Sequence, residues 1–362
     1  MLCYVSAKSL GLHPELLLDE IFGFRITLGS NNYYFRMASL PFTPSSSAFL
    51  SGNKYCVNQI LAKAGLPVPK AIALCKKDFR KKLVKEIVDE IKFPMVVKPT
   101  CRTALGKDVL CNVNTEEELI NHMEKCYKKK HVTMTVEAFH SGLKSYRVHV
   151  FFGKVIGIVE RTPSHVIGDG ISTISDLIDQ QNIIRKKIRH KVSLGLMNKS
   201  DPEYKIRLKD IGLTLGSVPA KDQYIQLCYN CNSTRGGTMR SLGKNHIHAS
   251  NAKLVSKASK LLNLNSVGFD VSCKDILAPY PDNQFVIIEA NENADVTIHE
   301  NAMEGVHNPI TKTIMKHLIK KHPFYYLKGL YQHAPQRVKF YLRSAFAAMI
   351  MFIMIFILEI ST

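Results

Sequence analysis

Two short apolar runs in the last third of the chain are the sequence feature that most constrains its fold. Each run ends in acidic or amide side chains. The runs VGFDV and FVIIEA lie within residues 266–293 and have the length and composition of buried strands. Pro279, Pro281, Asp282 and Asn283 lie between them and favour a turn, so we expect the strands to pair as a hairpin. Such a hairpin would bring side-chain oxygen atoms from both strands together.

The oxygen-bearing residues of this hairpin are Asp270, Glu289 and Asn291. Side chains alternate along a strand, so Glu289 and Asn291 share one face, and Asp270 can add a third oxygen from the neighbouring strand. Hard divalent cations prefer such ligands, which predicts a site for Mg²⁺, with Mn²⁺ as the alternative ion. The other interpretation is that these carboxylates are solvated or paired with basic side chains.

A lysine at the end of a second apolar run gives the site a cationic partner. The segment KFPMVVKPT is typical of a buried strand that ends at Lys98, and the loop after it contains Gly106 and Lys107. A lysine in this position can reach a polyphosphate while N–H groups of the loop help to hold it. A lysine at a strand end can equally be solvated, and this loop has a single glycine.

The strand VTMTVEAF ends near a segment that could contact a nucleotide base. We expect residues 137–142, which begin with Glu137, Ala138, Phe139 and His140, to form a hinge that could contact adenine. Backbone groups of the hinge would make this contact.

Composition defines the broad class of the protein. The chain has 362 residues, of which 46% are apolar, which is ordinary for a globular protein of one to three domains and excludes a disordered chain. Lys and Arg outnumber Asp and Glu by 49 to 30, a formal charge of +19, so anionic partners are favoured. Aromatic and basic residues do not alternate as in RNA-binding proteins, and we therefore expect no nucleic-acid partner.

The cysteines indicate a reducing compartment. Nine cysteines are scattered without a disulfide framework, and the N-terminal residues lack a charged leader followed by an apolar core, so we expect a cytoplasmic protein. Cys228 and Cys231 have the spacing of a zinc or redox pair but lack partner ligands nearby. Free thiols are therefore expected.

Several further elements follow from periodicity and turn residues. We expect a short helix near residues 14–21 and a hairpin turn at residues 29–32. An amphipathic helix is predicted after residue 51, ending before Gly65, and a basic one over residues 76–92. Another should begin at Asn114 or Thr115.

The ordered series of motifs along the chain resembles the ATP-grasp ligases, and most closely the ATP-grasp part of cyanophycin synthetases and bifunctional glutathione synthetases. The matching segments are NKYCVNQILAKAGLPVPK, FPMVVKP, VEAFHSG, YRVHVFFGKVIGIVERTPSHVIGDGISTISDLID, LGSVPAKDQ, NSTRGGT, VGFDVSCKDI and VIIEANEN. The resemblance implies an α/β (α+β) ATP-grasp fold in which two αβ subdomains clamp ATP under a mobile lid. It also implies ATP-dependent joining of a carboxylate to an amine through an acyl phosphate.

The resemblance extends to individual residues. It places Lys98 on the ATP phosphates, residues 137–140 at adenine, and Asp270, Glu289 and Asn291 at Mg²⁺. The positions that match its acyl-phosphate and substrate contacts are Arg147, Arg161, His165 and Arg235, together with Ser233, Thr234, Gly236, Gly237 and Thr238. Cations at the reacting carboxylate would stabilise the charge of the transition state. Any one of these arginines, Arg161 and Arg235 included, could instead be a surface charge.

Several departures from the pattern concern the substrate more than the nucleotide. The phosphate loop has fewer glycines than in the relatives, and STRGGT carries Arg235 as an apparent extra residue. The domains that complete cyanophycin or glutathione synthesis are not expected here, so neither product should form by the usual combined route. We expect an ADP-forming carboxylate–amine ligase that acts on an amino acid or short peptide. The alternative is a degenerate ATP-binding regulatory module.

The last part of the chain differs from the rest. Residues 345–358 are 14 consecutive apolar residues, preceded by Arg337, Lys339 and Arg343. We expect contact of residues 340–358 with the cytoplasmic face of a membrane, and the alternative is an interfacial or self-associating helix that makes a homo-oligomer. The expected organisation is an αβ segment at 1–50, the ATP-grasp domain at 51–322, and a basic linker with the hydrophobic tail at 323–362.

Overall fold

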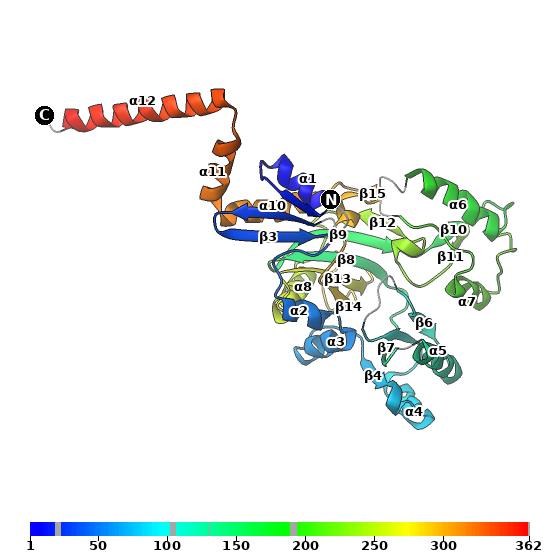
Figure 1. Ribbon diagram of the computed structural model, residues 1–362. Coiled ribbons are helices and arrows are strands. Elements are labelled where there is room, and N and C mark those ends of the chain that lie inside the picture. Colours follow the sequence, from blue (N-terminus) through cyan, green and yellow to red (C-terminus); the bar gives the residue numbers. More distant parts are fainter. Residues whose placement is uncertain (19–22, 102–105, 130, 189–193, 361–362) are drawn as a thin grey trace. The chain divides into compact units, whose positions relative to one another are not determined.

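The computed structural model describes residues 1–18, 23–101, 106–129, 131–188 and 194–360 (Figure 1). The chain forms two compact units, one of residues 1–37 with 311–362 and one of residues 38–310. The boundaries of these units do not coincide with those of the three predicted segments. The three-segment organisation remains a prediction. Each unit is described by itself below.

The smaller unit combines both ends of the chain. Helix α1 (Leu2–Ser9) precedes the antiparallel strands β1 (Glu15–Leu18), β2 (Gly23–Leu28) and β3 (Asn31–Arg36). The rings of Phe24 and Phe35 stack in its core with centroids 4.7 Å apart. Gly29, at a φ of 65°, and Ser30 form the predicted hairpin turn, whereas the two following asparagines already belong to β3.

The helix predicted near residues 14–21 is wrong. Within the described part of that segment, residues 15–18 form strand β1, which pairs with β2. The leucines of this run favour a helix by local propensity, but pairing with β2 decides the structure. An ion pair between Arg25 and Glu15, 2.5 Å apart, lies across the same two strands.

The smaller unit also contains the C-terminal helices α10 (Ile310–Lys321), α11 (Pro323–His333) and α12 (Gln336–Ile360). The 14-residue apolar run is thus part of a helix of 25 residues, about 37 Å long at 1.5 Å per residue. Among the described residues, one helix, at Gln336–Ile355, is long and apolar enough to cross a membrane, by length and composition only.

The larger unit begins with α2 (Ser45–Ser51) and α3 (Lys54–Lys63), and then forms a four-stranded sheet in the order β4-β7-β5-β6. Its strands are β4 (Ala71–Cys75), β5 (Met95–Pro99), β6 (Leu110–Val113) and β7 (Thr133–Ala138). Helices α4 (Lys81–Ile91) and α5 (Glu116–Lys128) bury their apolar faces against this sheet. A separate 3₁₀ turn (Lys76–Asp78) precedes α4, so the predicted basic helix is shorter than expected, whereas Thr115 caps α5 as predicted.

The central sheet has six strands in the order β14-β13-β8-β9-β12-β15. They are β8 (Lys144–Phe151), β9 (Lys154–Thr162), β12 (Thr238–Ser241), β13 (Ser266–Cys273), β14 (Val286–Asn291) and β15 (Glu304–Gly305). Helices α3 and α8 (Ala249–Leu261) pack on it. Strands β13 and β14 pair antiparallel, which confirms the predicted hairpin.

A small subdomain with its own core lies between β9 and β12 in the sequence. It contains β10 (His165–Ile167), α6 (Ile174–Ile188), α7 (Pro202–Asp210), β11 (Tyr224–Gln226) and the 3₁₀ turn η2 (Ser233–Arg235). The core is built from apolar side chains of these elements, including Ile174, Leu208 and Ile225. Figure 1 shows these elements, in green, grouped at one end of the central sheet. The short helix α9 (Thr297–Glu300) completes the larger unit.

Candidate functional site

A cavity in the larger unit has a volume of about 1180 Å³. Its walls come from the four-stranded sheet, the central sheet and the small subdomain. Residues expected in the site that line it are Lys98, Gly106, Glu137, Ala138, Phe139, His140, Arg147, Arg161, Ser233, Thr234, Asp270, Glu289 and Asn291. Folding therefore brings together motifs that are almost 200 residues apart.

Lys98 is buried on β5 beside a carboxylate of the neighbouring strand β7. Its Nζ lies 2.7 Å from Oε2 of Glu137, and both side chains are at most 5% exposed. Burial alone would lower the pKa of Lys98, but the charges of Glu137 and Glu289 outweigh it and raise this pKa. Lys98 is thus an ionised lysine and not a solvated one. Glu137 acts as its partner, a role that the hinge interpretation did not include.

Asp270 joins two arginines across three adjacent strands. Arg147 on β8 lies opposite Asp270 on β13, and its Nε donates to Oδ1 at 2.5 Å. Arg161 on β9 donates from Nη1 to Oδ2 at 3.0 Å and from Nη2 to Ser145 Oγ at 2.9 Å. Each arginine side chain is 13% exposed, so the alternative of a surface charge is wrong for Arg161. Burial would raise the pKa of Asp270, but the two arginines lower it.

Glu289 faces the same side of the sheet as Asp270, because the two residues lie opposite each other in the β13–β14 pair. Its Oε1 lies 3.2 Å from Nζ of Lys54, a residue that sequence reasoning missed. Lys54 is the first residue of α3, and Asn53 caps this helix. A lysine in a first helical turn opposes the helix dipole, and this is the signal that could have identified it.

Four cationic and three anionic side chains meet at this end of the cavity. Lys54, Lys98, Arg147 and Arg161 face Glu137, Asp270 and Glu289, which leaves one positive charge among these seven residues. These four cations are the groups that can bind an anion such as a polyphosphate or a carboxylate, because the rest of the lining adds Lys144 but also Glu160, Glu292 and Asp295.

The same residues suit a divalent cation in part. Glu289 and Asn291 lie two residues apart on one face of β14, and Nδ2 of Asn291 is oriented to Gly268 O at 3.4 Å, which leaves its Oδ1 as the ligand atom. Both oxygens of Asp270 accept from arginines, but each keeps a further lone pair. Among the described residues, no three His, Cys, Asp or Glu side chains form a metal cluster, so phosphate oxygens would have to complete the shell.

The hinge segment has already used two of its backbone donors. The N–H of Ala138 donates to Lys70 O at 2.9 Å, and the N–H of Phe139 donates to Pro94 O at 3.0 Å. These residues can therefore offer a base only their carbonyl oxygens and side chains. His140 lines the cavity as well, and burial lowers its pKa.

The two neighbouring residues Gly106 and Lys107 of the phosphate loop differ in their position relative to the cavity. Gly106, at a φ of 69°, lines the cavity, whereas Lys107 is exposed and is not part of the lining. The rest of the loop, residues 102–105, lies outside the described residues. Asp108 ties the loop to the end of α5, since its carboxylate lies 2.6 Å from Lys129 Nζ and 2.9 Å from His131 Nε2.

The STRGGT segment is divided between the cavity and the small subdomain. Ser233 and Thr234 line the cavity, but Gly236, Gly237 and Thr238 do not. Arg185 of α6 donates to the carbonyl oxygens of Gly236 and Gly237, which holds this part of the loop on the subdomain.

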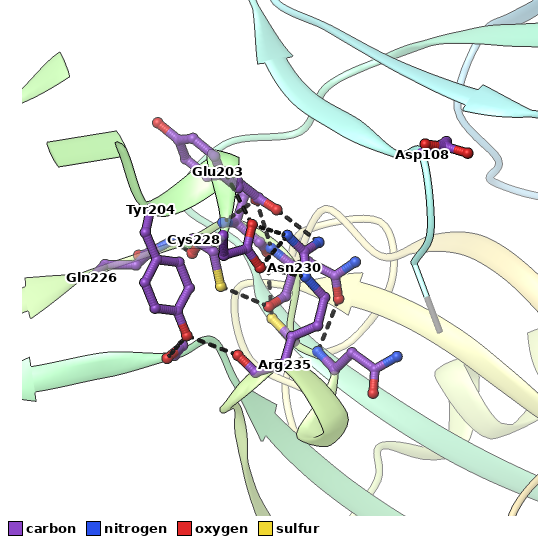
Figure 2. Close-up of polar contacts among 12 residues, drawn as sticks. Asp108, Glu203, Tyr204, Gln226, Cys228, Asn230 and Arg235 are labelled. Atoms are coloured by element: carbon purple, nitrogen blue, oxygen red, sulfur yellow. Dashed lines mark hydrogen bonds and ion pairs between the residues drawn. The ribbon is translucent and has the colours of Figure 1, made fainter. Parts of the chain in front are cut away.

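Arg235 and His165, which were predicted to contact the substrate, contact other residues of the chain in the structure. Figure 2 shows Arg235 beside Glu203, and its guanidinium forms ion pairs of 2.6 Å with Asp201 and 2.9 Å with Glu203. His165 stacks on Tyr224, and its Nδ1 lies 2.9 Å from Pro163 O. Neither residue lines the cavity. Arg235 is not a surface charge either, because its side chain is only 20% exposed.

The chain matches no protein-family model, but it is similar to several characterised proteins. It is 28% identical over 278 residues to cyanophycin synthetase of Synechocystis sp., an alignment that covers 74% of this chain and 30% of the relative. It is 25% identical over 323 residues to the glutathione biosynthesis bifunctional protein GshAB of Pasteurella multocida, with coverage of 85% and 41%. The chain thus spans less than half the length of these relatives.

A solved structure agrees with these relatives. The crystal structure of a bifunctional glutathione synthetase from Pasteurella multocida superposes with a TM-score of 0.58 at 23% identity, and covers 88% of this chain and 44% of that one. The resemblance inferred from the motifs is therefore confirmed. This chain is a homologue of the cyanophycin synthetases and of the bifunctional glutathione synthetases, and it has the ATP-grasp fold.

Proposed function

We propose that this protein uses ATP to join a carboxylate to an amine, with an amino acid or short peptide as substrate. The observation that carries the proposal is the convergence of the buried Lys98, the two arginines on Asp270, and Glu289 with Asn291 on one cavity. The named relatives make cyanophycin and glutathione, and this supports amide formation as the class of reaction. Because the chain spans less than half of their length, the particular product is not inferred.

The reaction would proceed in two steps. A carboxylate oxygen of the first substrate attacks the γ-phosphorus of ATP, the bond from this phosphorus to the β,γ-bridging oxygen breaks, and ADP leaves. An amine then attacks the acyl carbon, phosphate leaves, and the amine nitrogen loses a proton to solvent. Arg147 and Arg161 would hold the carboxylate and the transferred phosphoryl group, and Lys98 would hold the ATP phosphates.

Glu289 and Asn291 would hold Mg²⁺ together with phosphate oxygens of ATP, and Asp270 is the candidate for a third ligand. When bound, the ion would neutralise charge on the β- and γ-phosphates. Lys54, which pairs with Glu289, would then be able to contact a phosphate or the substrate carboxylate. Ala138, Phe139 and His140 would line the position of the base.

The test is product analysis. The protein is incubated with ATP, Mg²⁺ and pooled amino acids and dipeptides, the nucleotide products are quantified, and new amides are identified by mass. We expect ADP and phosphate together with an amide. AMP and pyrophosphate as the main products would exclude the acyl-phosphate reaction.

Variants of the cavity separate binding from turnover. Lys98→Ala should weaken ATP binding about ten- to a hundredfold, because one charge-assisted contact contributes roughly 1.5–3 kcal/mol. Glu289→Gln and Asn291→Ala should abolish turnover in a folded protein, because they remove ligands that act on the transition state. Calorimetric titration with ATP and a turnover assay measure the two effects. Three variants with full activity and unchanged Mg²⁺ dependence would show that the site is elsewhere.

A second candidate function is an ATP-binding regulatory module without turnover. It is favoured by the pairing of Asp270 and Glu289 with basic side chains, which uses carboxylate oxygens that a metal would need. ATP binding without ADP release in the pooled-substrate assay would support this candidate over the ligase.

We propose further that helix α12 attaches the protein to the anionic cytoplasmic face of a membrane. Its apolar residues form one continuous helix with Arg337, Lys339 and Arg343 at the N-terminal end. The full chain should sediment with vesicles that contain anionic lipid, and removal of residues 337–362 should abolish sedimentation without loss of ATP binding. A full-length protein that stays soluble and monomeric without lipid or detergent would exclude the anchor.

A further inference from the structure

A buried acidic residue of the small subdomain holds the part of the chain that faces the phosphate loop. Glu203 is the second residue of α7 and is 6% exposed. Its Oε1 accepts the backbone N–H groups of Tyr229 and Asn230 at 2.6 and 3.2 Å (Figure 2). These two residues line the cavity. Glu203 therefore holds the backbone of one cavity wall, although its own side chain does not line the cavity.

Arg235 balances the buried charge of Glu203. Its Nη1 lies 2.9 Å from Oε2 of Glu203, and its Nε and Nη2 donate to Asp201. Tyr204, next to Glu203 in the sequence, donates from its hydroxyl to Arg235 O at 2.8 Å. Arg235 was predicted from the sequence to contact the substrate, but in the structure it is the counter-ion of the buried carboxylate of Glu203.

The two residues held by Glu203 contact the opposite wall of the cavity. Tyr229 accepts a hydrogen bond from Asn112 Nδ2 of β6 at 2.9 Å, and its ring packs edge-on against Phe139 of the hinge at 5.4 Å. The side chain of Asn230 lies against Gly106, where an added Cβ would be 2.1 Å from Asn230 Nδ2. The small subdomain therefore bridges to both the phosphate loop and the hinge through these two neighbouring residues.

We propose that Glu203, neutralised by Arg235, is a positioning residue that sets Tyr229 and Asn230 as a latch across the nucleotide cavity. The latch would close the gap between the small subdomain and the four-stranded sheet and retain the bound nucleotide. This inference rests on the proposed function for the identity of the ligand. The arrangement of Glu203, Tyr229 and Asn230 is independent of it.

Glu203→Gln tests the inference, because it keeps the shape and one acceptor oxygen but removes the charge that Arg235 balances. Asp222→Asn is the matched control, since it removes an acidic charge at an exposed position of the same small subdomain. Arg235→Lys is the second variant, to be used if Glu203→Gln alters the far-UV circular dichroism. Hydrogen exchange of the Tyr229 and Asn230 amides is measured by mass spectrometry without nucleotide, and dissociation of a fluorescent ATP analogue by stopped flow.

We expect the protection of both amides to fall at least tenfold in Glu203→Gln and to stay unchanged in Asp222→Asn. The ATP analogue should dissociate about tenfold faster, with a matching rise in KM for ATP and a kcat within about threefold of the parent. Unchanged amide protection in both variants would overturn the role of Glu203. Lost protection with an unchanged dissociation rate would overturn the latch. A parent protein that binds the analogue but makes no amide would instead count against the proposed function alone.

Discussion

Two regions of the larger unit hold a largely buried arginine beside carboxylates, yet only one directs it into the cavity. Arg161 of the central sheet contacts Asp270 and lines the cavity, whereas Arg235 of the small subdomain contacts Asp201 and Glu203 and does not. The chemistry of the two groups is the same. Burial and pairing alone therefore do not identify a substrate contact, and position relative to the cavity decides between them.

Removal of the shared carboxylate of the central sheet should have the largest effect. Asp270→Asn leaves two largely buried arginines without their negative partner, and breaking a buried pair costs about 3–5 kcal/mol. We expect turnover to be lost and the midpoint of urea unfolding to fall accordingly. Asp282→Asn, at an exposed position in the loop of the same hairpin, should change neither. A stable, active Asp270→Asn protein would show that the two arginines of the central sheet do not depend on Asp270, contrary to the comparison made above.

Replacing each arginine by methionine tests the comparison itself. Arg161→Met should lower kcat by at least a hundredfold, because it removes a cation from the part of the cavity where we propose that the reaction takes place. Arg235→Met should leave kcat within about threefold while lowering stability, because it leaves the buried Glu203 without its counter-ion. Steady-state kinetics and urea unfolding on the same preparations separate the two effects. An equal loss of kcat would show that both arginines reach the substrate.

A buried histidine pair, one residue on β8 and one on α9, makes stability depend on pH. His149 and His299 lie 5.6 Å apart between ring centroids, and His149 is 1% and His299 0% exposed. Burial lowers the pKa of His149 to about 3 and also lowers that of His299. The folded state therefore binds fewer protons than the unfolded state, whose histidines have a pKa of about 6.5. Stability is fully present above this value and is lost as the pH falls below it.

Each of the two histidines should contribute a loss of about 1.4 kcal/mol per pH unit below 6. His299→Leu should reduce the slope of unfolding free energy against pH between 6 and 5, whereas His307→Leu, at an exposed position, should not. Urea unfolding at several pH values measures the slope. An unchanged slope in His299→Leu would mean that other groups dominate the acid sensitivity.

The smallest effect concerns the contact between the small subdomain and the phosphate loop. Gly106 and Gly65 both have a φ of 69°, so alanine at either position costs about 1–2 kcal/mol in backbone strain. Only at Gly106 would the added Cβ also meet a neighbour, the side chain of Asn230, because nothing lies within 4 Å at Gly65. Gly106→Ala should therefore weaken ATP binding beyond the shared loss of stability. Equal ATP affinity in the two variants would show that this contact has no role in binding.

The strand side of the site could be predicted from the sequence because its pattern is local. Alternation within β14 places Glu289 and Asn291 together, and pairing with β13 adds Asp270. Lys98 was found for the same reason, at the end of a buried strand. Lys54 was missed because a single lysine at a helix start has no periodic pattern.

The small subdomain could not be predicted in the same way. Glu203 and Arg235 are 32 positions apart, and their pairing depends on how α7 folds onto η2, which no short sequence pattern records. The erroneous helix at residues 14–21 has a similar cause, since the pairing of β1 with β2 overrides the helix propensity of its leucines. Contacts that depend on tertiary packing were the ones missed in both places.

The central claim is that the cavity forms an acyl phosphate. Its most direct test is the transfer of oxygen from a substrate labelled with ¹⁸O in its carboxyl group. The substrate found in the pooled assay is labelled by exchange, and the products are analysed by mass spectrometry. We predict one ¹⁸O atom in the released phosphate and none in ADP. An amide product accompanied by ¹⁸O in AMP, or by unlabelled phosphate, would contradict the account.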